Sequence, residues 1–161
     1  MERRDELSFG GGMKSVKERS FWVLLGLGIW IGLVLGISFM EAPLKFRAPG
    51  ITTELGLGIG RLVFGALNKM ELVLLVVVSV FSVKLLRGQG RGYPFVFGML
   101  WIVMLLQSLY LLPVLDKRAE LIIAGSTPPD SWHHWGYVIL EGLKVPLLLS
   151  GFVMAYRRQS D

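Results

Sequence analysis

The sequence of 161 residues contains no cysteine and only two histidines. The absence of cysteine excludes disulfides, thiolate-bound metals, iron–sulfur clusters and c-type haem attachment, and it leaves the redox compartment unspecified. The sequence also lacks the G-x-S-x-G, H-E-x-x-H and P-loop motifs that mark common hydrolases and nucleotide-binding enzymes. We therefore expect a protein that is not an enzyme and has no metal site.

Apolar residues, in contrast, are in excess. They make up 53% of the chain, against roughly 45–50% in soluble domains. The excess lies in four blocks, at about residues 21–40, 55–86, 94–115 and 132–156, each long enough for the roughly 20 residues that a bilayer-spanning helix needs. A soluble domain is therefore rejected. Residues 21–158 are predicted to form an all-α integral membrane four-helix bundle.

The first 20 residues, MERRDELSFGGGMKSVKERS, are polar. We expect a flexible cytoplasmic tail here. The run Gly10–Gly12 followed by Met13 leaves open whether residues 1–12 are native, an expression scar or sequence upstream of the true start. The apolar block after this tail is too long for a signal-peptide core and lacks a cleavage site, so we interpret it as a retained span.

Lysine and arginine counts predict the topology. Segments on the side of the N-terminus hold ten of these residues and the two opposite loops hold four, which favours both termini in the cytoplasm. The ten are Arg3, Arg4, Lys14, Lys17, Arg19, Lys84, Arg87, Arg91, Arg157 and Arg158, and the four are Lys45, Arg47, Lys117 and Arg118. Because these residues flank apolar spans and no nucleic-acid motif accompanies them, the net charge of +5 indicates lipid headgroups rather than nucleic acid as partner. We expect a multi-pass protein of the cell membrane, in bacteria the inner membrane.

Glycines recur every four residues in the first span, at Gly28, Gly32 and Gly36. This small-xxx-small pattern lets a neighbouring helix approach closely. Glycine is also tolerated singly in membrane helices, but three in register favour helix packing.

Apart from Lys84 at the end of the second block, six charged or amide residues fall inside the second and fourth apolar blocks. They are Arg61, Asn68, Lys69, Glu71, Glu141 and Lys144. An acid or a lysine at the centre of a membrane helix costs roughly 2.5–3.5 kcal/mol on insertion scales. Residues of this kind therefore need compensating partners or a function.

Their similar depth predicts one polar network inside the bundle. We expect Glu71 to pair with Lys144, and Glu141 to pair with Arg61 or Lys69. Such a network either specifies helix register as a structural ion pair or forms a proton or ligand site. The charges alone do not decide between these alternatives.

Both histidines lie at the start of the fourth span, between Trp132 and Trp135. As neighbours on a helix, His133 and His134 diverge by about 100° and cannot readily hold one ion together. Each is a candidate ligand or pH-sensing residue, or a member of the interfacial belt. His134 shares a helix face with Glu141, seven residues later.

Three segments together resemble small bacterial four-helix membrane proteins of unknown function, an uncharacterised domain family that has eukaryotic transmembrane relatives. They are FMEAPLKFRAPG, GIGRLVFGALNKMELVL and LDKRAELIIAGSTPPDSWHHWGYVILEGLK. The resemblance places Ala42-Pro43 in the first loop, Gly60 to Phe64 in the second helix, and His134 and Glu141 in the last. It implies a fold and a location, but no activity.

Three functions fit the sequence. The first is a non-enzymatic membrane protein with a polar site inside the bundle, acting as an accessory or assembly subunit with a membrane-protein partner. The second is a small ion-coupled carrier that uses Glu141, Lys144 and Glu71 and works as a homo-oligomer, because 161 residues form only one small bundle; no internal inverted repeat is visible. The third is a redox accessory protein that binds haem through His133 or His134; apart from that haem, no cofactor is expected.

Overall fold

A computed structural model describes residues 2–86, 92–129 and 131–160, with side chains over 18–83, 92–129 and 131–157. The described residues form helices joined by turns and contain no strand. The α-helices are α1 (Glu2–Leu33), α2 (Ala42–Leu44), α3 (Thr53–Leu86), α4 (Gly92–Leu106), α5 (Leu112–Ile123) and α6 (His133–Ser160). Two π-helical segments, η1 (Val34–Glu41) and η3 (Gln107–Leu111), and one 3-10 segment, η2 (Lys45–Arg47), complete the order.

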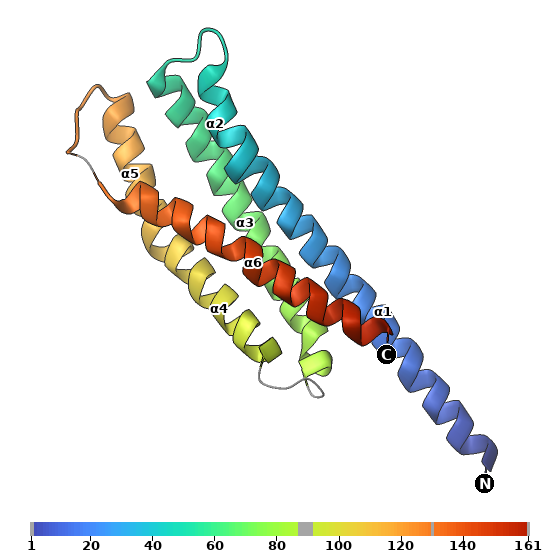
Figure 1. The fold of residues 1–161 in the computed structure, drawn as a ribbon. Coiled ribbons are helices and arrows are strands. Elements are labelled where there is room, and N and C mark those ends of the chain that lie inside the picture. The colour runs from blue at the N-terminus through green and yellow to red at the C-terminus, as the bar shows by residue number, and fades with distance from the viewer. Residues whose placement is uncertain (1, 87–91, 130, 161) are drawn as a thin grey trace.

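These segments combine into four long helices, which confirms the all-α four-helix bundle. Each is long and apolar enough to cross a membrane: Glu18–Arg47, Thr53–Val83, Gly92–Ile123 and His133–Arg157. The connection from α2 to α3 and the connection from α5 to α6 lie at one end of the bundle, while the C-terminus lies at the other (Figure 1). This first end is called the loop end below. The cytoplasmic location of both termini remains a prediction.

The structure corrects the first boundary, because α1 begins at Glu2 where a flexible tail is predicted. The segment is rich in glutamate, arginine and lysine, which are good helix formers. Extending an existing helix also costs far less than nucleating a new one. The span at Phe21 therefore propagates toward the N-terminus through the glycine run.

The first and third spans are also longer than predicted. The helical path runs on through Pro43 to Arg47, and through Pro113 to Ile123. A proline inside a helix lacks a backbone donor and clashes with the carbonyl four residues earlier. In both spans a wider π segment, η1 or η3, ends two residues before the proline. We attribute the continuation to these wider turns, which reposition the carbonyl that the proline ring would meet.

The apolar core lies between α1, α3, α4 and α6, on the side of the bundle away from the loop end. Its fully buried members include Leu27, Trp30, Leu75, Leu100 and Leu148. Together they form a layer without polar side-chain groups other than the Trp30 indole N–H.

Close packing of α1 uses a different glycine from those predicted. A Cβ on Gly26 would lie 2.7 Å from Val78 Cγ2 on α3, so a larger residue there requires a shift of the packed atoms. A Cβ on Gly32 or Gly36 would meet no atom within 4 Å, and one on Gly28 would meet only Phe152 at 3.9 Å. Within the chain, the predicted Gly28, Gly32 and Gly36 face therefore does not make the close helix contact, because Gly26 lies on the face that α3 covers.

Candidate functional site

Three charged side chains meet in the middle of the bundle. Lys144 Nζ on α6 lies 2.5 Å from Glu71 Oε1 on α3 and 2.8 Å from Glu141 Oε1 on its own helix. Lys144 and Glu71 have no exposed surface, and Glu141 retains 2%. The pair between Glu71 and Lys144 that matched depth predicts is thus present. We call Glu71, Glu141 and Lys144 the ionic cluster.

Three neutral side chains bond the carboxylates of the ionic cluster. The indole N–H of Trp30 donates to Glu71 Oε1 at 2.8 Å. Ser38 Oγ donates to Glu141 Oε2 at 3.1 Å, and Gln107 Nε2 donates to Glu141 Oε1 at 3.1 Å. None of the three was predicted as a site residue.

The two π segments supply the donors to Glu141. Ser38 lies in η1, and Gln107 is the first residue of η3. Single π turns occur often at functional sites, where the extra residue changes the direction of a side chain. A sequence signal for both segments existed in the prolines that follow them, Pro43 and Pro113, although proline alone does not predict a π turn.

The other predicted network residues lie elsewhere. Asn68 Nδ2 donates to Ser108 Oγ at 2.8 Å, which joins α3 to η3. Lys69 is exposed on the outer face of α3. Arg61 binds acids of α5 instead of Glu141, so the predicted pairing of Glu141 with Arg61 or Lys69 is wrong. The reason is local: Lys144, one turn after Glu141 on the same helix, already forms the ion pair with that carboxylate.

Three buried oxygens around the ionic cluster have no hydrogen-bond partner in the described part of the chain. They are Glu71 Oε2, Gln107 Oε1 and Tyr137 Oη. Buried polar atoms in folded proteins are nearly always paired, so such atoms mark water, an ion or a functional feature. The cluster therefore has spare acceptor capacity but no second cation among the described ion pairs.

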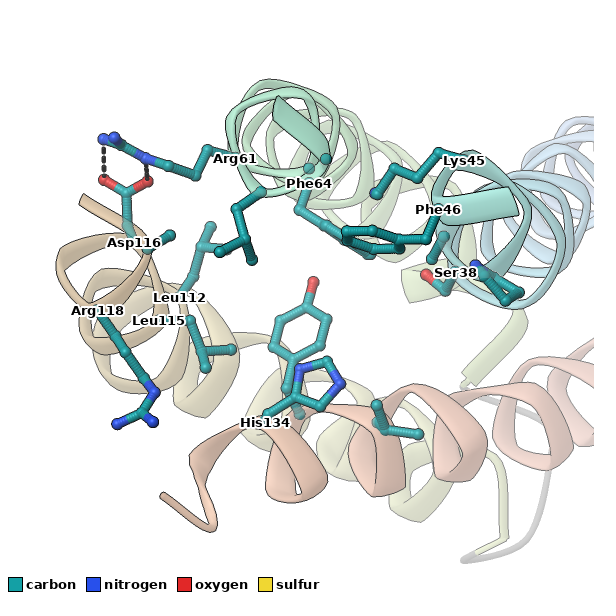
Figure 2. Close-up of a pocket in the computed structure, with 18 of the residues that line it drawn as sticks. Ser38, Lys45, Phe46, Arg61, Phe64, Leu112, Leu115, Asp116, Arg118 and His134 are labelled. Carbon is teal, nitrogen blue, oxygen red and sulfur yellow. Dashed lines mark hydrogen bonds and ion pairs between the residues drawn. The ribbon is translucent and has the colours of Figure 1, made fainter. Parts of the chain in front are cut away.

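A cavity of about 650 Å³ lies at the loop end and reaches the ionic cluster. Its walls come from η1, α2 and η2, the first turns of α3, α5, and the first turns of α6. Most of the lining is apolar, and Ser38, Tyr137 and Glu141 are among its polar members. His134 and Glu141 both line it, as does Tyr137, so the helix face that the sequence predicts for His134 and Glu141 borders this space. Figure 2 shows His134 at the cavity.

One wall of the cavity depends on two glycines of α3. The ring of Phe46 occupies the place that a Cβ on Gly56 would need, and Lys45 Nζ lies 3.2 Å from where a Cβ on Gly60 would be. Lys45 also stands 5.1 Å from the ring centroid of Phe64 and pairs with Glu41 at 3.3 Å. The glycines thus let η2 lie close against α3.

The opposite wall is tied by charged groups, and Figure 2 shows Arg61 and Asp116 facing each other there. Arg61 Nε lies 2.5 Å from Asp116 Oδ1 and Arg61 Nη2 lies 3.0 Å from Asp116 Oδ2. A third contact joins Arg61 Nη2 to Glu120 Oε1 at 2.6 Å. Arg118 donates to the carbonyls of Pro128 and Pro129. These contacts fix α5 to α3 and to the loop before α6.

The two histidines face different surroundings. His133 Nε2 lies 3.1 Å from Tyr110 Oη, its Nδ1 contacts Ser131 Oγ, and its ring stacks on Trp132 at 4.5 Å between centroids. His134 lines the cavity. The described lining of the cavity contains neither a second histidine nor a methionine, so it offers one axial haem ligand of these types. The pair therefore does not converge on one ligand.

No protein-family model matches the chain, and neither the curated proteins nor the solved structures contain a match. The resemblance to an uncharacterised membrane family therefore stays a prediction, and functional inference starts from the ionic cluster and the cavity.

Proposed function

We propose that the chain is a non-enzymatic, multi-pass protein of the bacterial inner membrane that binds an amphipathic small molecule or lipid at the loop end of its bundle. The observation that carries the proposal is the cavity whose inner wall holds Glu141. An apolar recess that ends on a hydrogen-bonded, buried carboxylate is typical of a ligand site with one orienting polar group.

The size of the cavity fits this function. Its volume of about 650 Å³ falls within the roughly 300–1,000 Å³ of small-molecule sites. Phe46, Phe64, Leu112 and Leu115 give it an apolar surface. A mainly hydrocarbon ligand would gain about 25 cal/mol for each Å² of apolar surface removed from water.

The polar groups of the cavity stand at its two extremes. Lys45, Arg61 and Asp116 are paired groups of both signs near the loop end, where a ligand headgroup would meet water and lipid headgroups. Ser38, Tyr137 and Glu141 stand at the inner end. We therefore expect a ligand with an apolar body and a headgroup that stays at the membrane interface.

The experiment that tests this function is identification of bound molecules. The full chain, purified in a mild detergent or a lipid nanodisc, is analysed by native mass spectrometry and by extraction. We expect an adduct of one amphipathic molecule per chain. Val138→Trp, which fills the cavity from α6, should abolish the adduct.

The matched control is Leu143→Trp, because Leu143 lies on the same helix, is 41% exposed and does not line the cavity. This variant should keep the adduct. Equal retention of an adduct by both variants, or no adduct in the unaltered protein, would contradict the proposal.

In the accessory role that the sequence predicts, a membrane-protein partner would receive the bound molecule. Stoichiometric co-purification of such a partner would support this role. One observation makes the carrier function the second candidate: the cavity lies at the loop end, and the buried apolar residues Trp30, Leu75, Leu100 and Leu148 pack on the other side of the ionic cluster. A carrier closed on one side would have this form. Flux of the identified ligand in liposomes, lost in Glu141→Gln, distinguishes a carrier from a binding protein.

A further inference from the structure

The ionic cluster does not balance its charge. Two carboxylates, Glu71 and Glu141, share one ammonium, Lys144, which leaves one negative charge uncompensated if both acids are ionised. Exposure is 2% or less for all three residues, so bulk solvent stabilises that charge little. An unpaired charge of this kind is among the most costly groups that a membrane interior can hold.

The groups that face the cluster from the other elements do not supply the missing charge. Trp30 from α1, Ser38 from η1 and Gln107 from η3 donate neutral hydrogen bonds. From α4, Met104 Sδ lies 3.9 Å from Lys144 Nζ, and Tyr137 brings a neutral hydroxyl from α6. In the described chain, Lys144 is the one cation in an ion pair with either carboxylate.

We infer that Glu71 and Glu141 together hold one exchangeable proton, and that the ionic cluster is a proton-binding site open to the loop end. One proton restores neutrality with Lys144. Since the two acids share one ammonium, the proton belongs to the pair rather than to either residue.

A proton fits the site better than a metal cation does. Lys144 Nζ already fills the space between the carboxylates, at 2.5 and 2.8 Å, and would repel a second cation there. The unpartnered atoms Glu71 Oε2 and Gln107 Oε1 are fully enclosed, and neither residue lines the cavity, so a larger ion has no access to them. A proton needs no added volume, and these oxygens offer it acceptors.

The cavity provides the route for exchange. Glu141, Ser38 and Tyr137 line it, so a water molecule entering from the loop end reaches one member of the carboxyl pair. One helical turn further in, the cluster meets the buried apolar residues Leu75, Leu100 and Leu148. The proton should therefore exchange with the loop end and not with the opposite side. This inference does not depend on the identity of any ligand.

Infrared spectroscopy of the full chain in lipid tests the inference. At neutral pH we expect a carbonyl band of one protonated carboxyl per chain, which shifts in heavy water. Glu71→Gln and Glu141→Gln should each remove it, since one carboxylate then balances Lys144. Glu120→Gln, at an exposed acid that pairs with Arg61, is the matched control and should keep the band. The amide band of the same samples verifies that each variant keeps its helices.

Lys144→Met gives an independent arm of the test. Without the ammonium both carboxyls should be protonated, and the band should grow about twofold. A missing band in the unaltered protein would overturn the inference. A band unchanged by both glutamine variants, or removed by just one of them, would overturn it as well, because each result places the proton outside a shared pair.

Discussion

Ser38 and Gln107, which lie on different long helices, donate hydrogen bonds to the two different oxygens of one carboxylate, that of Glu141. Each donor sits in a π-helical segment that precedes a proline. The carboxylate is thus held from three helices at once: its own, the first and the third. This arrangement fixes Glu141 at the inner end of the cavity and underlies the following predictions.

Removing one of these donors should weaken the bundle. Ser38→Ala deletes a hydrogen bond to a buried carboxylate, and bonds to charged groups contribute about 1.5–3 kcal/mol. We expect a loss of that size in the free energy of unfolding, measured by sodium dodecyl sulfate titration in mixed micelles. Ser150→Ala is the matched control, since Ser150 is exposed and bonds only the carbonyl of Pro146 on its own helix. Equal losses in the two variants would show that the bond from Ser38 is not formed.

The glycines of α1 should differ in their tolerance of a methyl group. Gly26→Ala places a Cβ 2.7 Å from Val78, and overpacking of this kind typically costs about 1–3 kcal/mol. Gly32→Ala meets no atom within 4 Å and should leave the free energy of unfolding unchanged or slightly raised. The same titration measures both. The reverse order would mean that the Gly32 face, not the Gly26 face, packs within the chain.

The chain's lack of cysteine makes its topology directly measurable. Ala48→Cys and Ser126→Cys introduce single thiols at exposed positions, one in each loop-end connection. Both should react with a membrane-impermeant maleimide in intact cells, because the loop end is predicted to face outward. The unaltered protein gives the background. Labelling of one position alone would exclude a common side for the two loops, and protection of both would place the loop end in the cytoplasm.

The sequence predicts the fold and part of the site for identifiable physical reasons. Four apolar blocks separated by charged segments admit few arrangements other than a helical bundle in a membrane. Matched depth along straight helices was enough to pair Glu71 with Lys144. Helix periodicity was enough to place His134 and Glu141 on one face, and both line the cavity.

Other features depend on geometry that no pattern encodes. The partners of Glu141 depend on π turns that redirect Ser38 and Gln107. A prediction that assumes a regular 3.6-residue period puts these two side chains on the wrong helix faces. Arg61 shares a helix with Glu71 but pairs with Asp116. Asp116 is within reach because α5 continues the third helix past Pro113. The cavity depends on how far the helices separate at the loop end, which follows from their packing rather than from their composition.

A double-mutant cycle on Glu71 and Lys144 tests the central claim, a buried ionic cluster that joins α3 to α6. Glu71→Gln, Lys144→Met and the double variant are compared by the same unfolding titration, with exposed Lys69→Met as the control that should change little. We predict that the double variant is more stable than the sum of the single effects implies, with a coupling free energy of about 1–3 kcal/mol. Single effects that add to within about 0.5 kcal/mol would contradict a direct contact between the two residues.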